Sequence, residues 1–146
     1  MKSFSKSYFK DIASIANKID FKQIDNLVLD LVKLKKKKGR IFFIGVGGSA
    51  GNCSHAVNDF RKLCNIESYA PTDNVSELTA RINDEGWNSS FSNWLNVSKL
   101  SSRDCVFIMS VGGGNLEKKV SVNIVEAIRY AKIVKSKIYG IVGHDG

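Results

Sequence analysis

The chain has 146 residues, a length that suits one domain with a substantial hydrophobic core. Its hydrophobic content of 43%, its single proline and its lack of low-complexity tracts exclude a disordered chain, and no apolar run approaches the ~20 residues that span a membrane. The formal charge of +8 suits an anionic substrate as well as a nucleic acid, so charge alone does not choose a partner.

The N-terminal stretch predicts two amphipathic helices, one over about Ser3 to Lys18 and one from Asp20 or Phe21 to near Gly39. It lacks the apolar block of a secretory signal, and the three cysteines form no CxxC pair, so we predict a cytoplasmic protein with reduced thiols. The helices need the sheet or another subunit to cover their apolar stripes, which predicts an oligomer. The two stripes are Phe4, Tyr8, Ile12, Ile15, Ile19 and Ile24, Leu27, Val28, Leu31, Val32.

A local run of cations, from Lys33 to Arg40, holds much of the excess charge. Cations at the end of a helix complement the helix dipole and stay solvated. Because no stacking aromatics interleave with these lysines, we predict a solvated helix end and no nucleic-acid partner.

The segment Ile41–Ile44 predicts a strand buried on both faces of a parallel sheet, followed by a glycine turn and a helix that runs to Leu63. We expect Gly45, Gly47 and Gly48 to adopt positive φ, and Ser49 to cap the helix. The helix N-terminus would favour a phosphate or a sugar oxygen. His55 and Asp59 are one helical turn apart, so they share a face of this helix.

The rest of the chain continues as a βα series. We predict a second strand over 66–70, a capping pattern at Asp73 to Glu77, a short helix that breaks at Asn83, Asp84 and Gly86, and a helix over Phe91, Trp94 and Leu95. The next strand is Cys105–Met109, and the last is Lys137–Val142. The helix between them is expected to bury Val125, Ile128, Ala131 and Ile133 or Val134.

A second glycine loop follows the strand Cys105–Met109. Ser110 and Ser121 offer hydroxyls, and the amides of Gly112, Gly113 and Gly114 offer an anion-binding nest. Alternatively, the glycines of both loops only make tight turns, and His55 and Asp59 are an ordinary surface pair. Neither loop is a dinucleotide or P-loop signature.

The fold class that these elements predict is α/β, a three-layer αβα sandwich around a parallel, flavodoxin-like sheet. Ligands bind such folds at the carboxyl ends of the strands, where both glycine loops fall. We predict a single domain over residues 1–146, with a helical pair at 1–38 and the αβα core at 39–146.

Three blocks of the sequence, GVGGSAGNCSHAVNDF, PTDNVSELTARINDEGW and SVGGG followed by VSVNIVEAI, resemble the sugar isomerase (SIS) domain family and its phosphoheptose isomerase subgroup. The resemblance covers nearly the whole chain. It implies a five-stranded parallel sheet, a homotetramer with sites between subunits and the N-terminal helices at its centre, and isomerisation of sedoheptulose 7-phosphate to the aldose through an enediol.

The resemblance also implies roles for individual residues. Gly47, Gly48 and Ser49 match the loop that contacts the sugar, with Val46 in place of the usual asparagine. Ser110 and Ser121 match the ends of the phosphate loop, with a glycine-rich insertion between them, and Asn83 and Asp84 match a pair near the substrate. His55 matches a zinc ligand. Asp59 matches a glutamate that is both metal ligand and general base, and it is one methylene shorter.

A partner histidine and a glutamine of the family lie beyond a fifth strand, and the sequence stops at Gly146 before either. The implied zinc site is therefore incomplete in this chain. Either the polypeptide is part of a longer product, or it is a shortened relative with impaired catalysis. The rivals to an isomerase are an SIS protein that serves as an interaction scaffold, such as those that bind the replication initiator, and a sugar-phosphate sensor.

Overall fold

The structure of the chain is a computed structural model that describes residues 3–143. The chain forms two compact units, one up to Val32 and one from Lys33 onward. The first unit contains α1 (Phe4–Lys18) and most of α2 (Phe21–Lys36). Ser3 caps α1 through the amide of Lys6, and the Asp20 carboxylate accepts a hydrogen bond from the amide of Lys22 (3.0 Å) at the start of α2. Both predicted helices are confirmed.

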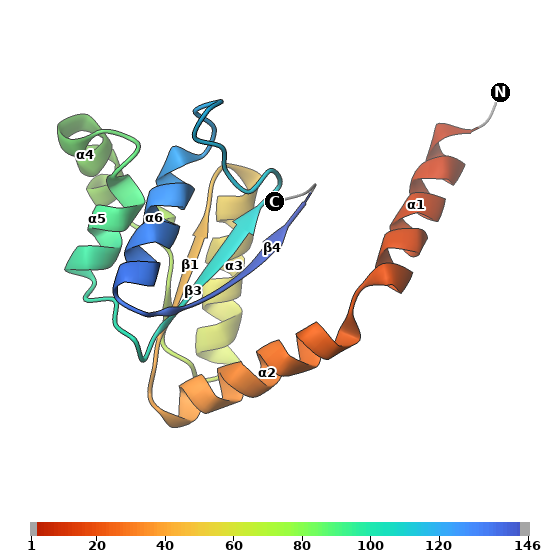
Figure 1. The fold of residues 1–146 in the computed structure, drawn as a ribbon, viewed down its shortest axis with the longest axis horizontal. Helices are drawn as coiled ribbons and strands as arrows, with labels where there is room; N and C mark the ends of the chain where they lie inside the picture. Colours follow the sequence, from red (N-terminus) through yellow and green to blue (C-terminus); the bar gives the residue numbers. More distant parts are fainter. Residues whose placement is uncertain (1–2, 144–146) are drawn as a thin grey trace. The chain divides into compact units, whose positions relative to one another are not determined.

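The second unit is built on a four-stranded parallel sheet in the order β2-β1-β3-β4 (Figure 1). The strands are β1 (Ile41–Gly45), β2 (Ser68–Tyr69), β3 (Cys105–Ser110) and β4 (Lys137–Val142). Gly45 pairs with Met109 and Ser110 with Val142, so the carboxyl ends of three neighbouring strands lie at one edge of the sheet. The predicted parallel α/β class is confirmed.

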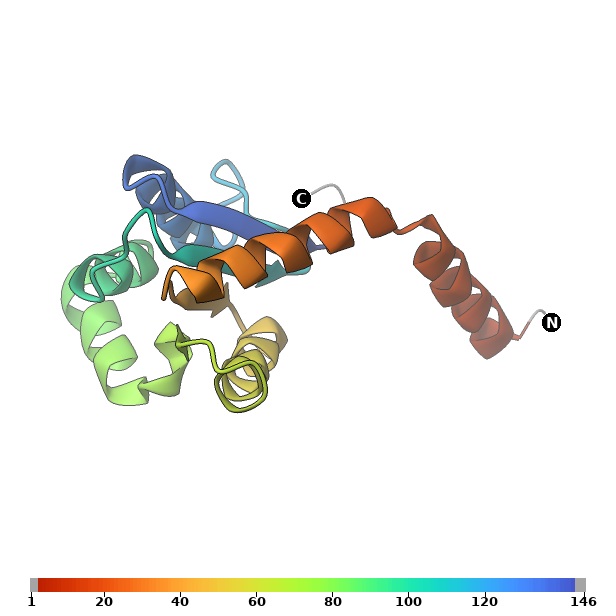
Figure 2. The ribbon, with the colours of Figure 1, turned by 90° about the horizontal axis from the view of Figure 1, so that it is seen from below.

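Helices cover both faces of the sheet (Figure 2). On one face lies α3 (Gly48–Lys62), where Phe60 packs on Phe43 with ring centroids 5.3 Å apart. On the other face lie α5 (Ser90–Val97) and α6 (Val122–Ile133). Every residue of β1 is buried, as a strand covered on both faces requires. The core on the α5 and α6 side consists of Phe42, Ile44, Phe91, Trp94, Leu95, Leu100, Val106, Ile108, Ile124, Ala127 and Ala131.

Three details of the predicted elements are wrong. The second strand has only two residues, because Pro71 starts a 3-10 turn, η1 (Pro71–Asp73), soon after it. The next helix, α4 (Val75–Glu85), does not break at Asn83 and ends only at Gly86, whose φ is +85°. In α6, Ala131 is buried and Ile128 and Val134 pack against the core as predicted, whereas Ile133 is 77% exposed and the buried Ile124 and Ala127 were not predicted.

The N-cap of α4 is Asn74, one residue after the predicted Asp73. The Asn74 side chain, not that of Asp73, accepts the hydrogen bond from the amide of Glu77 (3.2 Å). The Asp73 carboxylate accepts instead from the hydroxyl of Ser54 in α3. The turn between β2 and α4 is thereby joined to the helix that follows the first glycine loop.

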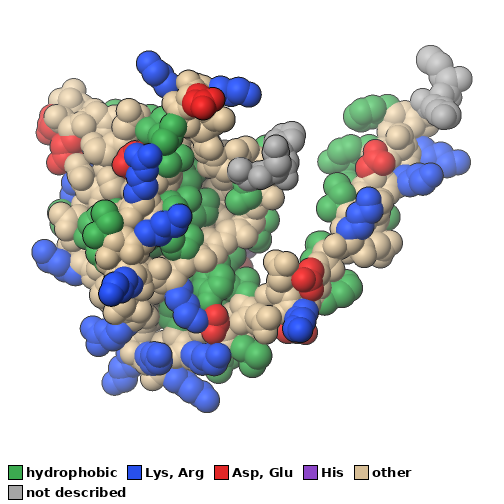
Figure 3. Space-filling view, in the orientation of Figure 1, with side chains coloured by type: hydrophobic (Ala, Val, Ile, Leu, Met, Phe, Trp, Pro, Cys, Tyr) green, Lys and Arg blue, Asp and Glu red, His purple; other side chains and the backbone are tan. Residues whose placement is uncertain are grey.

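The cationic run lies where α2 ends and β1 begins, and its side chains from Lys35 to Lys38 are exposed (Figure 3). This is the amino end of β1, opposite to the end where the glycine loop follows. Of the helices in the described part of the chain, none is both long enough and apolar enough to cross a membrane.

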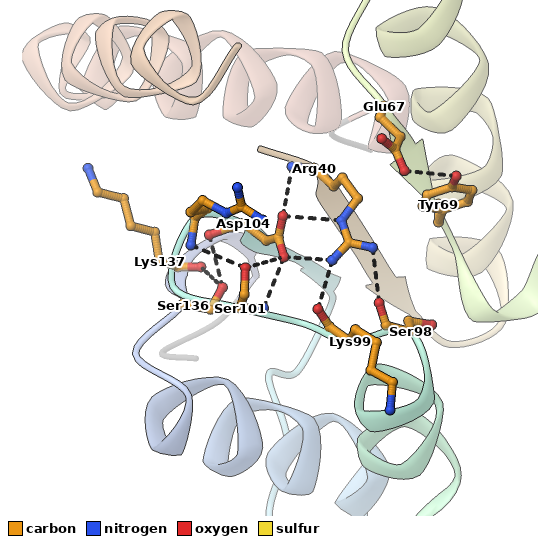
Figure 4. Close-up of polar contacts among 10 residues, drawn as sticks. Arg40, Glu67, Tyr69, Ser98, Lys99, Ser101, Asp104, Ser136 and Lys137 are labelled. Carbon is orange, nitrogen blue, oxygen red and sulfur yellow. Dashed lines mark hydrogen bonds and ion pairs between the residues drawn. The ribbon is translucent and has the colours of Figure 1, made fainter. Parts of the chain in front are cut away.

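A buried ion pair joins the amino ends of the central strands (Figure 4). The Asp104 side chain, 3% exposed, accepts from the backbone amide, Nε and Nη2 of Arg40 at 3.0, 3.2 and 2.9 Å, and from the amide and hydroxyl of Ser101, both at 2.9 Å. Arg40 also donates to the carbonyls of Ser98 (3.0 Å) and Lys99 (2.8 Å). These bonds fix the start of β1 to the loop before β3.

The same contacts set the ionisation of the pair. Burial by itself would raise the pKa of Asp104, but the hydrogen bonds and charge of Arg40, with those of Ser101, outweigh burial and hold that pKa below its usual range. The hydrogen bond to Asp104 correspondingly raises the pKa of Arg40. Both groups are therefore charged at neutral pH.

Candidate functional site

The first glycine loop connects the buried end of β1 to α3. Gly47 is the N-cap of α3 and has φ +62° and ψ −128°, a conformation for which glycine is strongly preferred. A Cβ on Gly45 would lie 2.8 Å from the backbone of Ser49, so glycine there lets α3 start close to the strand. Nothing lies within 4 Å of a Cβ added at Gly47 or Gly48, so this side of the loop is open.

Two expectations for this loop are corrected. Gly47 alone of Gly45, Gly47 and Gly48 has a positive φ. Ser49 does not cap the helix, because α3 starts at Gly48 and its N-cap has no side-chain hydrogen bond. Of the first three amides of α3, those of Ser49 and Ala50 already donate to the carbonyls of Val46 (3.2 Å) and Gly47 (3.0 Å), so among the described residues only the amide of Gly48 is left for an anion or a sugar oxygen.

His55 and Asp59 form an ion-pair contact along α3, with His55 Nε2 3.3 Å from Asp59 Oδ2. The two side chains are 78% and 42% exposed, so they lie on the outer surface of the helix. His55 is seven residues beyond Gly48, about 10 Å along the helix axis. The pair therefore lies two turns or more along α3 from the glycine loop and is open to solvent.

Cys53, between the loop and His55, is not a candidate nucleophile. It is fully buried, and burial, with the nearby charge of Asp73, raises the pKa of its thiol to about 11. Its sulfur would be 3.0 Å from a Cβ at Gly45, which places it in the packed layer between α3 and β1.

The second glycine loop leads from β3 to α6 through a small hairpin. The Ser110 hydroxyl donates to the carbonyl of Gly113 (3.3 Å), and the amide of Gly114 donates to the carbonyl of Gly112 (2.9 Å). One amide of the predicted nest is thus already bonded within the loop. Gly113 has φ +71°, and Asn115 and Val120 close the hairpin with two backbone hydrogen bonds of 2.9 Å each.

Ser121 is the N-cap of α6 and adopts the left-handed conformation, with φ 49° and ψ 39°. Its hydroxyl makes no capping bond. Its neighbour Asn123 is fully buried, with Oδ1 accepting from the amide of Ile124 (3.0 Å) and Nδ2 without a partner among the described residues. The amide of Ile124 also donates to the carbonyl of Ser121 (3.0 Å), so the start of α6 offers the Ser121 hydroxyl and the amides of Val122 and Asn123, which have no partner among the described residues and suit an anion.

Asn83 and Asp84 lie in the last turn of α4, both exposed, and Asn83 Nδ2 donates to Asp84 Oδ1 at 2.7 Å. No hydrogen bond or ion pair joins them to either glycine loop or to the pair on α3 within residues 3–143. Sequence reasoning missed the Ser54–Asp73 contact, although two adjacent capping residues, Asp73 and Asn74, leave one side chain for another partner.

The structure thus brings the two glycine loops together and leaves the other candidates apart. Because β1 and β3 are adjacent and parallel, Gly47–Ser49 and Ser110–Gly114 lie at one edge of the sheet, with two helix N-termini. Such an edge favours a polyhydroxylated anion. His55 with Asp59, and Asn83 with Asp84, lie on separate helices.

The family resemblance implies a zinc site that includes His55 and Asp59. Zinc sites usually have four ligands, or three protein ligands and water. Within the described residues, no group of three or more His, Cys, Asp or Glu side chains is placed to hold a metal ion. His55 and Asp59 supply two donors only, so this chain's described residues do not fit a zinc site by themselves.

Comparison with known proteins gives a consistent result. No protein-family model matches the chain. A phosphoheptose isomerase of Syntrophotalea carbinolica is 26% identical over 151 residues, covering 97% of this chain and 72% of the relative. A phosphoheptose isomerase of Buchnera aphidicola is 26% identical over 136 residues, covering 90% of this chain and 66% of the relative. The chain is thus shorter than the relatives that it matches.

Solved structures share the fold. A phosphoheptose isomerase from Francisella tularensis matches with a TM-score of 0.83 at 22% identity, over 100% of this chain and 77% of the other. A phosphoheptose isomerase from Neisseria gonorrhoeae matches with a TM-score of 0.68 at 24% identity, over 95% of this chain and 76% of the other. The chain therefore resembles phosphoheptose isomerases in sequence over nearly its whole length and has their SIS fold.

Proposed function

We propose that the chain belongs to an isomerase that interconverts sedoheptulose 7-phosphate and the corresponding aldose phosphate. The observation that carries the proposal is the position of its two glycine and serine loops. They follow adjacent parallel strands, β1 and β3, in a chain whose curated relatives are named phosphoheptose isomerases. In this proposal the sugar lies against Gly47–Ser49, and the phosphate lies at Ser110, Ser121 and the first amides of α6.

Asp59 is the proposed general base. Its carboxylate removes the proton from C1 of the ketose while the carbonyl oxygen on C2 gains a proton. The carboxylate then returns the proton to C2 of the enediol while the hydroxyl on C1 loses its proton, which gives the aldose. In this proposal His55, 3.3 Å from Asp59, orients the carboxylate, gives a proton to the carbonyl oxygen on C2 and takes one from the hydroxyl on C1. Since both side chains face outward, this proposal requires a second surface to close the site.

Zinc takes no part in this scheme. The described residues supply two donors, and a metal at this position would need further ligands from a partner subunit or from other residues. We keep zinc as a proposal for the assembled enzyme only.

The proposal is tested by incubating the purified chain with sedoheptulose 7-phosphate, with and without added zinc, and following the aldose product by chromatography. We expect product formation, together with saturable binding in calorimetry. Binding without product under both conditions would favour the sensor or scaffold reading, which the exposure of His55 and Asp59 also supports. The absence of both binding and product would refute the sugar-phosphate site itself.

We further propose that the N-terminal helices assemble copies of the chain into a homotetramer. None of the apolar residues in the stripe of α1 is buried, and those of the stripe of α2 are at most partly covered. Phe4 is 81% exposed and Ile15 is 65% exposed, and such apolar surface is stable in water only when another surface covers it.

The double substitution Ile12→Glu and Ile15→Glu is expected to convert the tetramer to smaller species, because it places charges within the apolar stripe. Sedimentation equilibrium measures the mass of the assembly. Lys10→Glu is the matched control, since it adds a glutamate to the same helix outside the stripe. A wild-type chain that sediments as a stable monomer would contradict the tetramer.

A further inference from the structure

A pocket lies on the α5 side of the sheet, and no residue of either glycine loop lines it. It has a volume of about 380 Å³, within the range of small-molecule sites. Its walls come from the start of β1, the end of β2, the turn into α4, and α5. The lining residues are Arg40, Phe42, Tyr69, Ala70, Asp73, Asn74, Glu77, Trp94 and Ser98. None of them belongs to the proposed sugar-phosphate site.

Three aromatic side chains form the apolar part of the pocket. The ring of Phe42 has Trp94 edge-on at 5.6 Å and Tyr69 at 6.1 Å between centroids. Phe42 is fully buried and Trp94 is 8% exposed, whereas Tyr69, at 38%, forms the outer wall. Tyr69 donates its hydroxyl hydrogen to Glu67 (3.0 Å), which fixes its ring. Rigid aromatic walls of this kind bind flat or cationic groups.

Arg40 also lines the pocket, but it is not available to bind an anion. Figure 4 shows its guanidinium between Asp104 and the carbonyls of Ser98 and Lys99. Four of its five side-chain N–H groups donate to these partners, and its Cζ lies 5.0 Å from the centroid of the Phe42 ring. Asp104 neutralises its charge.

The lining also contains the carboxylates of Asp73 and Glu77, of which Glu77 forms an ion pair with Arg81 (2.8 Å) and Asp73 has no ion pair with a described residue. Glu77 uses only Oε1 in its bonds to Arg81, at 2.8 and 2.9 Å, and Asp73 uses only Oδ1 in its bond to Ser54. Their other oxygens, Glu77 Oε2 and Asp73 Oδ2, accept no hydrogen bond from any described residue. In a chain with a formal charge of +8, this is an acidic pocket with aromatic walls.

We propose that this pocket is a second ligand site, and that it takes a small organic amine. The ammonium group would donate to the free oxygens of Asp73 and Glu77, and its apolar body would lie against Trp94 and Tyr69. The carboxylates exclude phosphorylated sugars from the pocket. The inference is independent of the proposed isomerase, because the two sites share no residue.

The probe is 2-phenylethylamine, compared with 2-phenylethanol, which is neutral and of similar shape, and with phenylacetate, which is an anion. The chain has two tryptophans, so the variant Trp87→Phe leaves Trp94 in the pocket as the only tryptophan reporter. We expect the amine to cause a saturable change in tryptophan fluorescence. The alcohol should bind at least about tenfold more weakly than the amine, and phenylacetate should not bind. Sedoheptulose 7-phosphate should not displace the amine.

Charge-neutral variants locate the site. Glu77→Gln and Asp73→Asn should each weaken binding of the amine several-fold and leave binding of the alcohol unchanged. Glu85→Gln is the matched control, because Glu85 also pairs with Arg81 but does not line the pocket. Circular dichroism confirms that each variant is folded.

The proposal would be overturned by no saturable signal with the amine, by equal affinity for the amine and the alcohol, or by the same loss in Glu85→Gln as in Glu77→Gln. Displacement of the amine by the sugar phosphate would also overturn it, since the two ligands would then share one site. A failed isomerase assay leaves all of these measurements unaffected.

Discussion

Asp104→Ala is expected to lower the free energy of unfolding by about 3–5 kcal/mol, because it leaves the Arg40 guanidinium half-buried without its carboxylate. Arg40 also loses the acceptor for its backbone amide, and Ser101 loses the acceptor for its amide and hydroxyl. A domain of this size has about 5–15 kcal/mol of stability in total, so the variant would be close to unfolding.

Urea denaturation followed by circular dichroism measures this loss. Glu117→Ala, in the exposed hairpin after β3, is the control and should change stability by about 0.5 kcal/mol or less. A loss of under 1 kcal/mol in Asp104→Ala would mean that the Arg40 and Asp104 contacts contribute little beyond their own desolvation.

The pair also predicts a pH dependence. The pKa of Asp104 is lower in the folded chain than in the unfolded chain, where it is about 3.9. Ionised Asp104 therefore contributes its full stabilisation of the folded state above the pKa of the unfolded chain. This stabilisation is lost as pH falls through the lower pKa of the folded chain. Asp104→Asn, which cannot ionise, should show a smaller loss of stability between neutral pH and pH ~3 than the unaltered chain.

Asp59→Asn is expected to reduce kcat of the proposed isomerisation by about 100-fold or more, since an amide cannot take the proton from C1. KM should change little, because the glycine loops hold the sugar phosphate. Asp59→Glu should retain activity, because it keeps a carboxylate. It adds the methylene that the family's glutamate has, so activity should rise if the shorter Asp59 side chain limits how closely the carboxylate approaches C1.

The assay is the conversion of sedoheptulose 7-phosphate by each variant. Glu126→Gln, which removes a carboxylate from the outer face of α6 near Arg129, controls for loss of charge alone. Asp59→Asn with unchanged kcat would remove Asp59 from the role of base. A loss of equal size in Asp59→Glu would indicate that the pair with His55, and not the carboxylate's reach, is what matters.

Much of the fold was predictable from local patterns. The buried run Ile41–Ile44 followed by glycines predicted a central strand, and the strand Lys137–Val142 was predicted with its observed bounds. Errors arose where two local solutions are nearly equivalent. Asp73 and Asn74 are both good caps, and Asn74 is the one that caps α4; in α6 the predicted Ala131, Ile128 and Val134 face the core together with Ile124 and Ala127, which were not predicted.

The candidate site was predictable to a smaller extent. The sequence predicted two glycine loops at the carboxyl ends of strands, and the parallel register of β1 and β3 places them side by side. The roles of His55, Asp59, Asn83 and Asp84 stay predictions. The first two side chains are exposed on α3 and the other two on α4, so the chain does not bring the two pairs together.

By itself, the sequence determined the order and type of the elements, because hydrophobic period and glycine position are local properties of the chain. Only the tertiary structure decided which distant residues meet. The Arg40 and Asp104 cluster joins residues 64 positions apart, and the pocket of Phe42, Tyr69 and Trp94 combines two strands and a helix. Neither has a sequence signature, because each contact depends on how the sheet and helices pack.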